Sequence, residues 1–396
     1  PDRSPSIALF PITACCYSPA QLTRHCAHPV PRCCSCKVPG PVVPGQHIRR
    51  QSPLARSLAS AYTAAMIKTL PDTLVDQFQR RVSYLRLSVT DRCDFRCVYC
   101  MAEDMEFAPK SEILSLEELY HVARAFTELG VAKIRLTGGE PLIRNNIMSL
   151  VQRMGQLPGL QELAITSNGS QLQRLAPELK RAGVKRINIS LDSLNPRKFR
   201  QLTRHGNLDQ VIAGVDAAIA AGFEGIKLNA VILKGRNEDE VLELVGFARD
   251  RRIDIAFIEE MPLGLIDDHD RALTFFSSEE LRATLAPHCQ LTAEGEPGES
   301  SGPARYYRLA DSATRVGFIS PHSNNFCHLC NRVRVTVEGR LLLCLGNEHS
   351  VDLREVLRAP DYTLEKLKWA IVDAMNLKPE RHYFDNATKP QILRFM

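Results

Sequence analysis

The stretch Leu85-Arg86-Leu87-Ser88-Val89-Thr90-Asp91-Arg92-Cys93-Asp94-Phe95-Arg96-Cys97-Val98-Tyr99-Cys100 decides the fold. Its first half has a largely alternating apolar pattern, which predicts a strand over residues 84–89. The strand runs into a loop with three cysteines spaced C-x3-C-x2-C, close enough to bind one metal centre. A closed zinc or iron–sulfur site normally takes four protein ligands, so this loop would leave one metal position open to a small chelating molecule.

The chain that follows alternates predicted strands and helices. Further strands are predicted at residues 133–137, 162–166, 186–190, 226–231 and 254–259. Helices are predicted near residues 116–129, 147–156, 172–182, 208–221, 238–250 and 364–376. The first helix begins at a capping box of Ser115 and Glu118 and ends at Gly130. Six strand–helix units predict a parallel sheet covered by helices, in either an open sheet or a barrel.

A second cysteine triad lies near the C-terminus, in Cys327-His328-Leu329-Cys330-Asn331-Arg332-Val333-Arg334 and Cys344. One interpretation is a zinc site completed by a histidine, for which the candidates are His322, His328 and His349. Again, however, only three cysteines are present. Arg332 and Arg334 would point to the same face of a strand, which suits an anion beside an open metal position.

Four cations fall within predicted strands, namely Arg86, Lys133, Arg135 and Lys227. A single basic residue in such a strand is usually half exposed or in a salt bridge. Four around one end of the sheet favour a polyanionic ligand, because burying unpaired charge is costly. No G-x4-G-K-[ST] phosphate loop is present, so side chains would have to hold a nucleoside triphosphate.

The motif Thr137-Gly138-Gly139-Glu140-Pro141 follows the second predicted strand. Its two glycines allow the backbone to approach a ligand closely, and Glu140 adds a hydrogen-bond acceptor. Taken alone, the motif is more typical of a plain strand-to-helix turn. Behind a three-cysteine loop, a ligand-binding role is favoured.

These motifs together resemble the radical S-adenosylmethionine (SAM) enzymes, and among them most closely the GTP 3′,8-cyclase family of molybdenum cofactor biosynthesis. The resemblance rests on the C-x3-C-x2-C loop with Tyr99 before its last cysteine, and on the C-x2-C-N-R-x-R element followed by Cys344. It runs from about Met66 almost to the C-terminus. It implies an α/β fold: a partial (β/α)6 TIM-type barrel over residues 66–270, and a C-terminal domain over residues 271–396 that carries a second iron–sulfur cluster.

The resemblance also implies which residues bind the cofactors, two [4Fe–4S] clusters and SAM. The first cluster would be held by Cys93, Cys97 and Cys100, and the second by Cys327, Cys330 and Cys344. The residues expected to contact SAM are Tyr99, Gly139, Ser190 and Met261.

For the substrate GTP, the family's positions match Arg86, Arg135, Thr166, Lys227, Arg332, Val333 and Arg334, with Lys133 a weaker candidate. One departure is Ala256, where the family usually carries arginine before Phe-Ile-Glu. It removes a cation from the expected site.

The implied reaction is that of a lyase. A SAM-derived 5′-deoxyadenosyl radical removes the hydrogen at C3′ of GTP, and (8S)-3′,8-cyclo-7,8-dihydroguanosine 5′-triphosphate results. Implied partners are a flavodoxin- or ferredoxin-type one-electron donor, cyclic pyranopterin monophosphate synthase downstream, and a second copy of the chain in a homodimer. Two alternatives stay open: a peptide-modifying radical SAM enzyme with an auxiliary cluster, and a zinc-binding interaction module.

Composition argues against nucleic-acid and membrane partners. The formal net charge is +5, but residues 1–65 alone contribute +6, so the body is close to neutral. No apolar run approaches the roughly 18 residues that a membrane-spanning helix needs. Metal-ligand spacing in both triads favours metal binding in a reducing compartment over disulfides, which predicts a cytoplasmic location.

The first 65 residues hold ten of the 24 prolines and show no sustained period, so they are not expected to form a packed core. They are predicted to be either a non-native upstream extension before a natural start at Met66, or an organellar transit peptide, which would place the protein in the mitochondrial matrix. At the other end, the family usually continues past Arg-Phe-Met into a tail that closes with two glycines. The sequence stops at Met396, which we expect to affect turnover if it is the true end.

Overall fold

The computed structural model describes residues 69–262, 266, 268–295, 302–323, 326–345 and 350–382. The predictions for residues 1–65, for His349 and for the C-terminal tail lie outside these residues. All the described residues belong to one compact unit, which begins at Lys68.

Six parallel strands form the centre of the sheet, in the order in which they occur along the chain. They are β3 (Tyr84–Ser88), β4 (Lys133–Thr137), β5 (Glu162–Ser167), β6 (Val184–Ser190), β7 (Gly225–Val231) and β8 (Asp254–Ile258). Each predicted strand is confirmed to within two residues.

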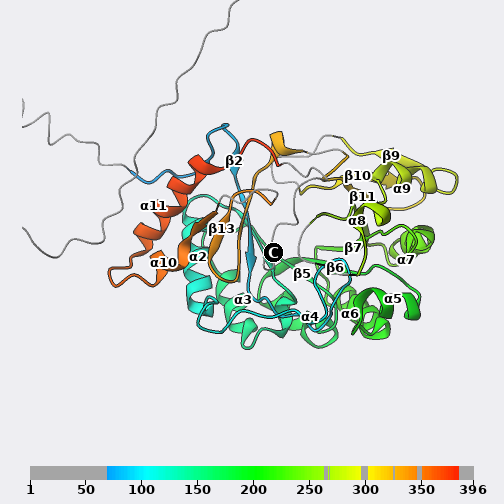
Figure 1. The fold of residues 1–396 in the computed structure, drawn as a ribbon, viewed down its shortest axis with the longest axis horizontal. Coiled ribbons are helices and arrows are strands. Elements are labelled where there is room, and N and C mark those ends of the chain that lie inside the picture. The colour runs from blue at the N-terminus through cyan, green and yellow to red at the C-terminus, as the bar shows by residue number, and fades with distance from the viewer. Residues whose placement is uncertain are drawn as a thin grey trace, which may run out of the picture. The chain divides into compact units, whose positions relative to one another are not determined.

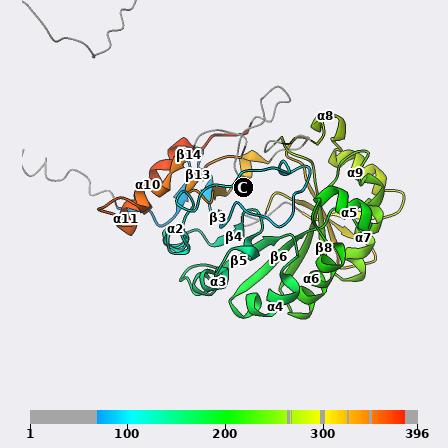
Figure 2. The same ribbon diagram turned by 60° about the horizontal axis from the view of Figure 1, so that its bottom comes forward.

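Helices follow these strands and lie side by side along the outer side of the sheet (Figures 1 and 2). They are α2 (Leu116–Glu128), α3 (Ile147–Gly155), α4 (Leu172–Arg181), α5 (Pro196–Thr203), α6 (Leu208–Ala220) and α7 (Val241–Asp250). The capping box is confirmed: Glu118 N donates to Ser115 Oγ, and Ser115 N donates to Glu118 Oε2. Helix α5 was not predicted, because its eight residues include only two apolar ones, Phe199 and Leu202.

Later strands extend the sheet at both edges. They are β9 (Leu291–Ala293), β10 (Arg305–Leu309), β11 (Arg315–Ile319), β12 (Arg332–Val335), β13 (Arg340–Leu342) and β14 (Ser350–Asp352). Strand β11 pairs parallel with β8, and β12 pairs parallel with β3. In the described residues the sheet runs from β14 to β9 without closing, as a partial barrel requires. The predicted domain boundary at residue 270 is not an edge of this sheet, and it stays a proposal.

Shorter elements complete the described part. They are β1 (Leu74–Val75), β2 (Arg81–Val82), η1 (Pro141–Ile143), η2 (Glu238–Glu240), α8 (Arg271–Thr274), α9 (Ser278–Leu285), η3 (Cys327–Leu329), α10 (Leu353–Leu357), α11 (Leu364–Ala374) and η4 (Met375–Leu377). Strands β1 and β2 form a separate hairpin, and α11 packs against α2. None of the helices in the described residues has both the length and the apolar character needed to cross a bilayer.

The strand period of two gives the sheet two different faces. Leu85 and Leu87 on β3 are fully buried in the hydrophobic core, whereas Arg86 between them lines a cavity. Strand β4 repeats the pattern, with Ile134 in the core and Arg135 at the cavity. The apolar face therefore packs against the helices, and the opposite face presents polar side chains.

Candidate active site

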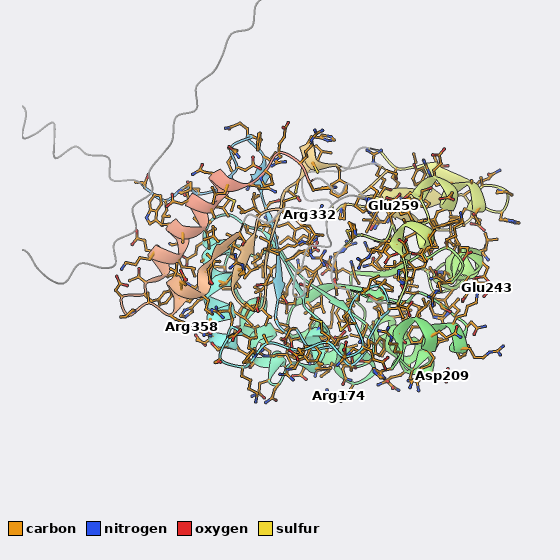
Figure 3. All side chains as sticks on the ribbon, viewed as in Figure 1. Arg174, Asp209, Glu243, Glu259, Arg332 and Arg358 are labelled. Atoms are coloured by element: carbon orange, nitrogen blue, oxygen red, sulfur yellow. The ribbon has the colours of Figure 1, made fainter. Side chains whose placement is uncertain are left out.

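A cavity of about 1360 Å³ lies on the polar face of the sheet. Every residue predicted to bind a cluster, SAM or GTP lines it, including all six cysteines of the two triads. In Figure 3, Arg332 and Glu259, both at this cavity, lie on the opposite side of the molecule from Arg174 and Asp209 on the outer helices. The structure thus brings the predicted residues together, while their individual roles stay proposals.

The first cysteine loop is held in place by the unpredicted helix α5. Arg96 N and Val98 N donate hydrogen bonds of 2.9 Å to the carbonyl oxygens of Thr203 and Leu202. The Phe95 ring also packs edge-on against Phe199, with 6.1 Å between ring centroids. Backbone hydrogen bonds and an aromatic contact therefore position the loop on α5.

Gly138 and Gly139 pack directly against the backbone of this loop. Gly138 has φ of +137°, and a Cβ at Gly139 would lie 2.2 Å from the carbonyl oxygen of Arg92. Gly139 N donates to Thr90 O, and Glu140 N donates to Arg92 O, both at 2.9 Å. The two glycines are thus required by the cysteine loop itself, a reason that the sequence motif alone did not reveal.

The three cysteines of the first triad line the cavity as free thiols. Each thiolate of an iron–sulfur cubane binds its own iron, so three thiols on one loop suit a cluster that keeps one iron open. Burial raises the pKa of Cys93 to about 12 and that of Cys97 well above its usual range. Iron binding would therefore have to displace their protons.

Tyr99 is oriented by an aspartate that the sequence analysis did not select. Its hydroxyl donates a 2.6 Å hydrogen bond to Asp192 Oδ2, and Asp192 Oδ1 accepts from Val231 N at 2.8 Å. Burial raises the pKa of Asp192 to about 6. Asp192 comes just after β6, and its place at a carboxyl end of a parallel strand is the signal that could have identified it.

Three arginines stand side by side on neighbouring strands. Arg334 on β12 is the Cα partner of Arg86 on β3, and Arg86 is the partner of Arg135 on β4. Part of the hydrogen-bonding capacity of Arg135 is used within the protein, because its Nε donates to Tyr84 Oη at 2.6 Å. In the described residues, Arg86 Nε and Arg334 Nη1 are buried without a hydrogen-bond partner. Such atoms point to a ligand rich in acceptors.

The cations of this face repel one another. Burial, followed by the charges of Arg135 and Arg332, lowers the pKa of Arg86 to about 10. Burial and then Arg135 lower the pKa of Lys227 to about 7. Arg334 shifts in the same direction, through burial and then Arg86. An anion in the cavity would relieve both the repulsion and the desolvation.

Lys133 and Val333, two of the predicted GTP residues, have contacts within the protein that bear on their predicted role. Lys133, predicted as the weaker GTP candidate, forms a 2.9 Å ion pair with Glu162. Val333 is buried in the hydrophobic core, between Arg332 and Arg334 on the same strand. A contact between Val333 and GTP would therefore involve its backbone.

The second triad lies among nitrogen donors that the sequence analysis missed. Cys327 Sγ is 3.0 Å from His382 Nδ1, and Cys330 Sγ is 3.5 Å from Lys378 Nζ. Burial acts to raise the pKa of Cys330, but Lys378 and then Arg332 lower it to about 7. Lys378 and His382 belong to a segment without a helical or strand period, so no local pattern points to them.

Two family profiles together match most of the part of the chain that the structure describes. A profile of the Radical SAM superfamily matches residues 87–248, and a profile named Molybdenum Cofactor Synthesis C matches residues 253–384. The curated GTP 3′,8-cyclase of Pseudomonas entomophila is 64% identical over 327 residues, covering 82% of this chain and 97% of that protein. The GTP 3′,8-cyclase of Marinobacter nauticus is 61% identical over 328 residues, covering 83% of this chain and 98% of that protein.

A solved structure of Streptococcus suis SuiB bound to the precursor peptide SuiA is similar in fold. Its TM-score is 0.53 at 14% sequence identity, covering 89% of this chain and 74% of that chain. At this identity the likeness supports the fold alone, and it does not favour a peptide substrate. The relatives of 58–64% identity also argue against a zinc-binding module. The chain belongs to the GTP 3′,8-cyclase family of radical SAM enzymes.

Proposed function

We propose that this chain catalyses the 3′,8-cyclisation of GTP, with two [4Fe–4S] clusters and SAM as its cofactors. One observation carries the proposal: a row of arginines, two of them with buried unpartnered nitrogens, faces the cavity that both cysteine triads line. Burying such charges is costly unless an anion completes the site. A triphosphate has the charge and the acceptor oxygens to do so.

In this proposal, Cys93, Cys97 and Cys100 hold the first cluster, and Cys327, Cys330 and Cys344 hold the second. When bound, the first cluster and SAM supply the 5′-deoxyadenosyl radical that removes hydrogen from C3′ of GTP. Gly139, Ser190 and Met261 contact SAM, and Tyr99, held by Asp192, contacts its adenine.

The chain's own residues position the substrate and exclude water. Arg86, Arg135 and Lys227 hold the triphosphate from three strands of the sheet. Thr166 and Arg332 to Arg334 complete the contacts to GTP next to the second triad. Hydrogen bonds between the cysteine loop and α5, together with strand pairing, position these residues relative to one another, which would limit reorganisation during the reaction.

The family resemblance also supplies partners for this proposal. A flavodoxin- or ferredoxin-type protein donates the electron, and cyclic pyranopterin monophosphate synthase takes up the product. We also propose a cytoplasmic homodimer. Size-exclusion chromatography with light scattering tests the dimer directly.

The test of the reaction is an anaerobic incubation of the reconstituted protein with SAM, a reductant and GTP deuterated at C3′. Mass spectrometry follows the 5′-deoxyadenosine that is released. We expect one deuterium in that product, together with a cyclised nucleotide. Unlabelled 5′-deoxyadenosine would retain the radical chemistry and exclude C3′ of GTP as its target.

Two variants serve as controls in the same assay. Cys97→Ser should abolish SAM cleavage, because it removes a ligand of the first cluster. Arg332→Ala should keep both clusters and weaken the use of GTP. Full GTP turnover by Arg332→Ala would contradict the assignment of that arginine.

A further inference from the structure

Lys378 is a buried lysine beside the second cysteine triad. Its side chain is 1% exposed, directly after η4. Its amine donates to Leu343 O at 2.9 Å and to Cys330 Sγ at 3.5 Å. Neither partner is a carboxylate, although a buried lysine amine is normally paired with one. The amine is therefore placed to face negative charge at the sulfur ligands.

The fold holds this lysine firmly. Pro379 follows Lys378, and a residue before proline is pushed out of the helical region, which ends η4 here. Arg80 then donates to the carbonyl oxygens of Pro379 and Glu380, each at 2.6 Å. Arg80 also donates to Cys327 O at 2.7 Å. One guanidinium thus joins the segment after Lys378 to the cysteine turn.

Lys378 connects the two arms of the second triad. Cys330 ends the turn η3, while Leu343 directly precedes Cys344, the third cysteine. Strands β12 and β13 lie between these arms in the sequence, and the amine of Lys378 contacts both arms. Without it, Cys344 would be less firmly placed relative to Cys330.

We infer that Lys378 is a positioning residue for the second iron–sulfur cluster, bridging Cys330 and the backbone before Cys344 and donating a hydrogen bond to the thiolate sulfur of Cys330. The inference rests on the proposed function, which assigns a cluster to this triad. Hydrogen bonds to ligand sulfurs raise the reduction potential of iron–sulfur clusters. Loss of this donor should therefore make the second cluster harder to reduce.

The test uses the full chain with Cys93→Ala, Cys97→Ala and Cys100→Ala, so that only the second triad contributes cluster signals. In this background, Lys378→Met and Lys378→Gln are compared with Lys368→Met. Lys368 is the control, because it lies on α11 and pairs with Glu128 away from the cavity. Iron per chain and the reduction potential, from an EPR-monitored titration, are measured after anaerobic reconstitution.

We expect the potential of Lys378→Met to shift to more negative values, with Lys378→Gln between it and the background protein. Loss of iron from a folded Lys378→Met, with Lys368→Met unchanged, would also support the bridging role. Unchanged iron and unchanged potential in Lys378→Met would overturn it. If circular dichroism shows that Lys378→Met does not fold, the reduction potential of Lys378→Gln tests the inference: a more negative value supports it and an unchanged value overturns it. Absence of iron from the background protein itself would instead overturn the proposed second cluster.

Discussion

Arg86 and Arg334 are direct Cα partners across the parallel ladder between β3 and β12, so two like charges stand next to each other on the cavity face. Each contributes a buried nitrogen without a hydrogen-bond partner in the described part of the chain. Because burying two unpaired like charges is costly, we expect the pair to destabilise the ligand-free protein. An anion bound by both guanidinium groups would offset this cost. The relationship therefore makes opposite predictions for stability and for substrate binding.

Arg334→Met should stabilise the ligand-free protein and weaken GTP binding. We expect the free energy of unfolding to rise by about 1 kcal/mol, because one buried unpaired charge is removed. We expect the Kd for GTP to rise about tenfold or more, because hydrogen bonds to charged groups contribute roughly 1.5–3 kcal/mol. Denaturant titration and calorimetry measure the two effects.

Arg174→Met on the outer helix α4 is the matched control, since Arg174 is exposed and lies far from Arg332 in Figure 3. It should change neither quantity appreciably. A destabilised Arg334→Met that binds GTP as tightly as the parent protein would show that Arg334 has a structural role.

Lys227 should make both the stability of the fold and GTP binding depend on pH. Its pKa falls from the usual 10.5 to about 7 in the folded chain. Between these values the unfolded chain binds a proton that the folded chain does not, so the contribution of Lys227 to stability is lost as the pH falls from about 10 to about 7. GTP should restore the higher pKa, and its binding at pH 8 should therefore take up about one proton.

Calorimetry in two buffers with different ionisation enthalpies measures this proton uptake. Lys227→Met should bind GTP with about one proton fewer taken up, and should remove the pH dependence described above. Equal proton uptake by the parent protein and Lys227→Met would assign the linkage to another group.

Gly139→Ala should damage the first cluster and spare the second. The added Cβ would lie 2.2 Å from Arg92 O and 2.9 Å from Asp91 O, both backbone atoms of the cysteine loop. The loop must then move, so we expect the iron content to fall to about half and SAM cleavage to be lost. Gly246→Ala is the control, because nothing lies within 4 Å of its added Cβ in α7 and it should stabilise the helix by about 0.5–1 kcal/mol. Full iron content in Gly139→Ala would contradict the prediction.

Local sequence patterns predicted the central fold well, because each strand from β3 to β8 carries its own period and its own turn. They could not predict that β11 and β12 extend the sheet, since such pairing joins residues such as Arg334 and Arg86 that are far apart in the chain. Local patterns also missed α5, whose stability comes from Phe199 and Leu202 packing under the cysteine loop. In each case tertiary contacts decided what the local pattern left open.

The same limit applied to the candidate site. The cysteines were predicted from their spacing along the sequence. The strand cations were predicted because charged residues are unusual in apolar strands. Asp192 and Lys378 were missed because their significance comes from Tyr99 and Cys330, the partners that the fold brings to them. The missing arginine at Ala256 could be noticed from the sequence, but what occupies its surroundings could not.

Tyr306 occupies those surroundings. Ala256 lies between Asn229 and Gly317 on the neighbouring strands, and a Cβ at Gly317 would be 2.9 Å from Tyr306 Cε1. The Tyr306 ring centroid is 5.8 Å from Lys227 Nζ and 4.6 Å from Arg315 Cζ. An aromatic face from β10 therefore lies beside the position where the family usually has a cation, and it contacts the lysine proposed to bind triphosphate.

Tyr306→Ala should consequently raise the KM for GTP by about 2- to 30-fold, the range that a cation–π contact of roughly 0.5–2 kcal/mol allows. The KM for SAM should stay nearly unchanged, since the ring lies beside Lys227, a residue predicted to bind GTP. Tyr306→Phe keeps the aromatic face and should behave like the parent protein. If Tyr306→Phe is as impaired as Tyr306→Ala, the hydroxyl group and not the ring makes the contact. If Tyr306→Ala has an unchanged KM for GTP, the ring only fills space above Gly317, and Lys227 is positioned by the sheet alone.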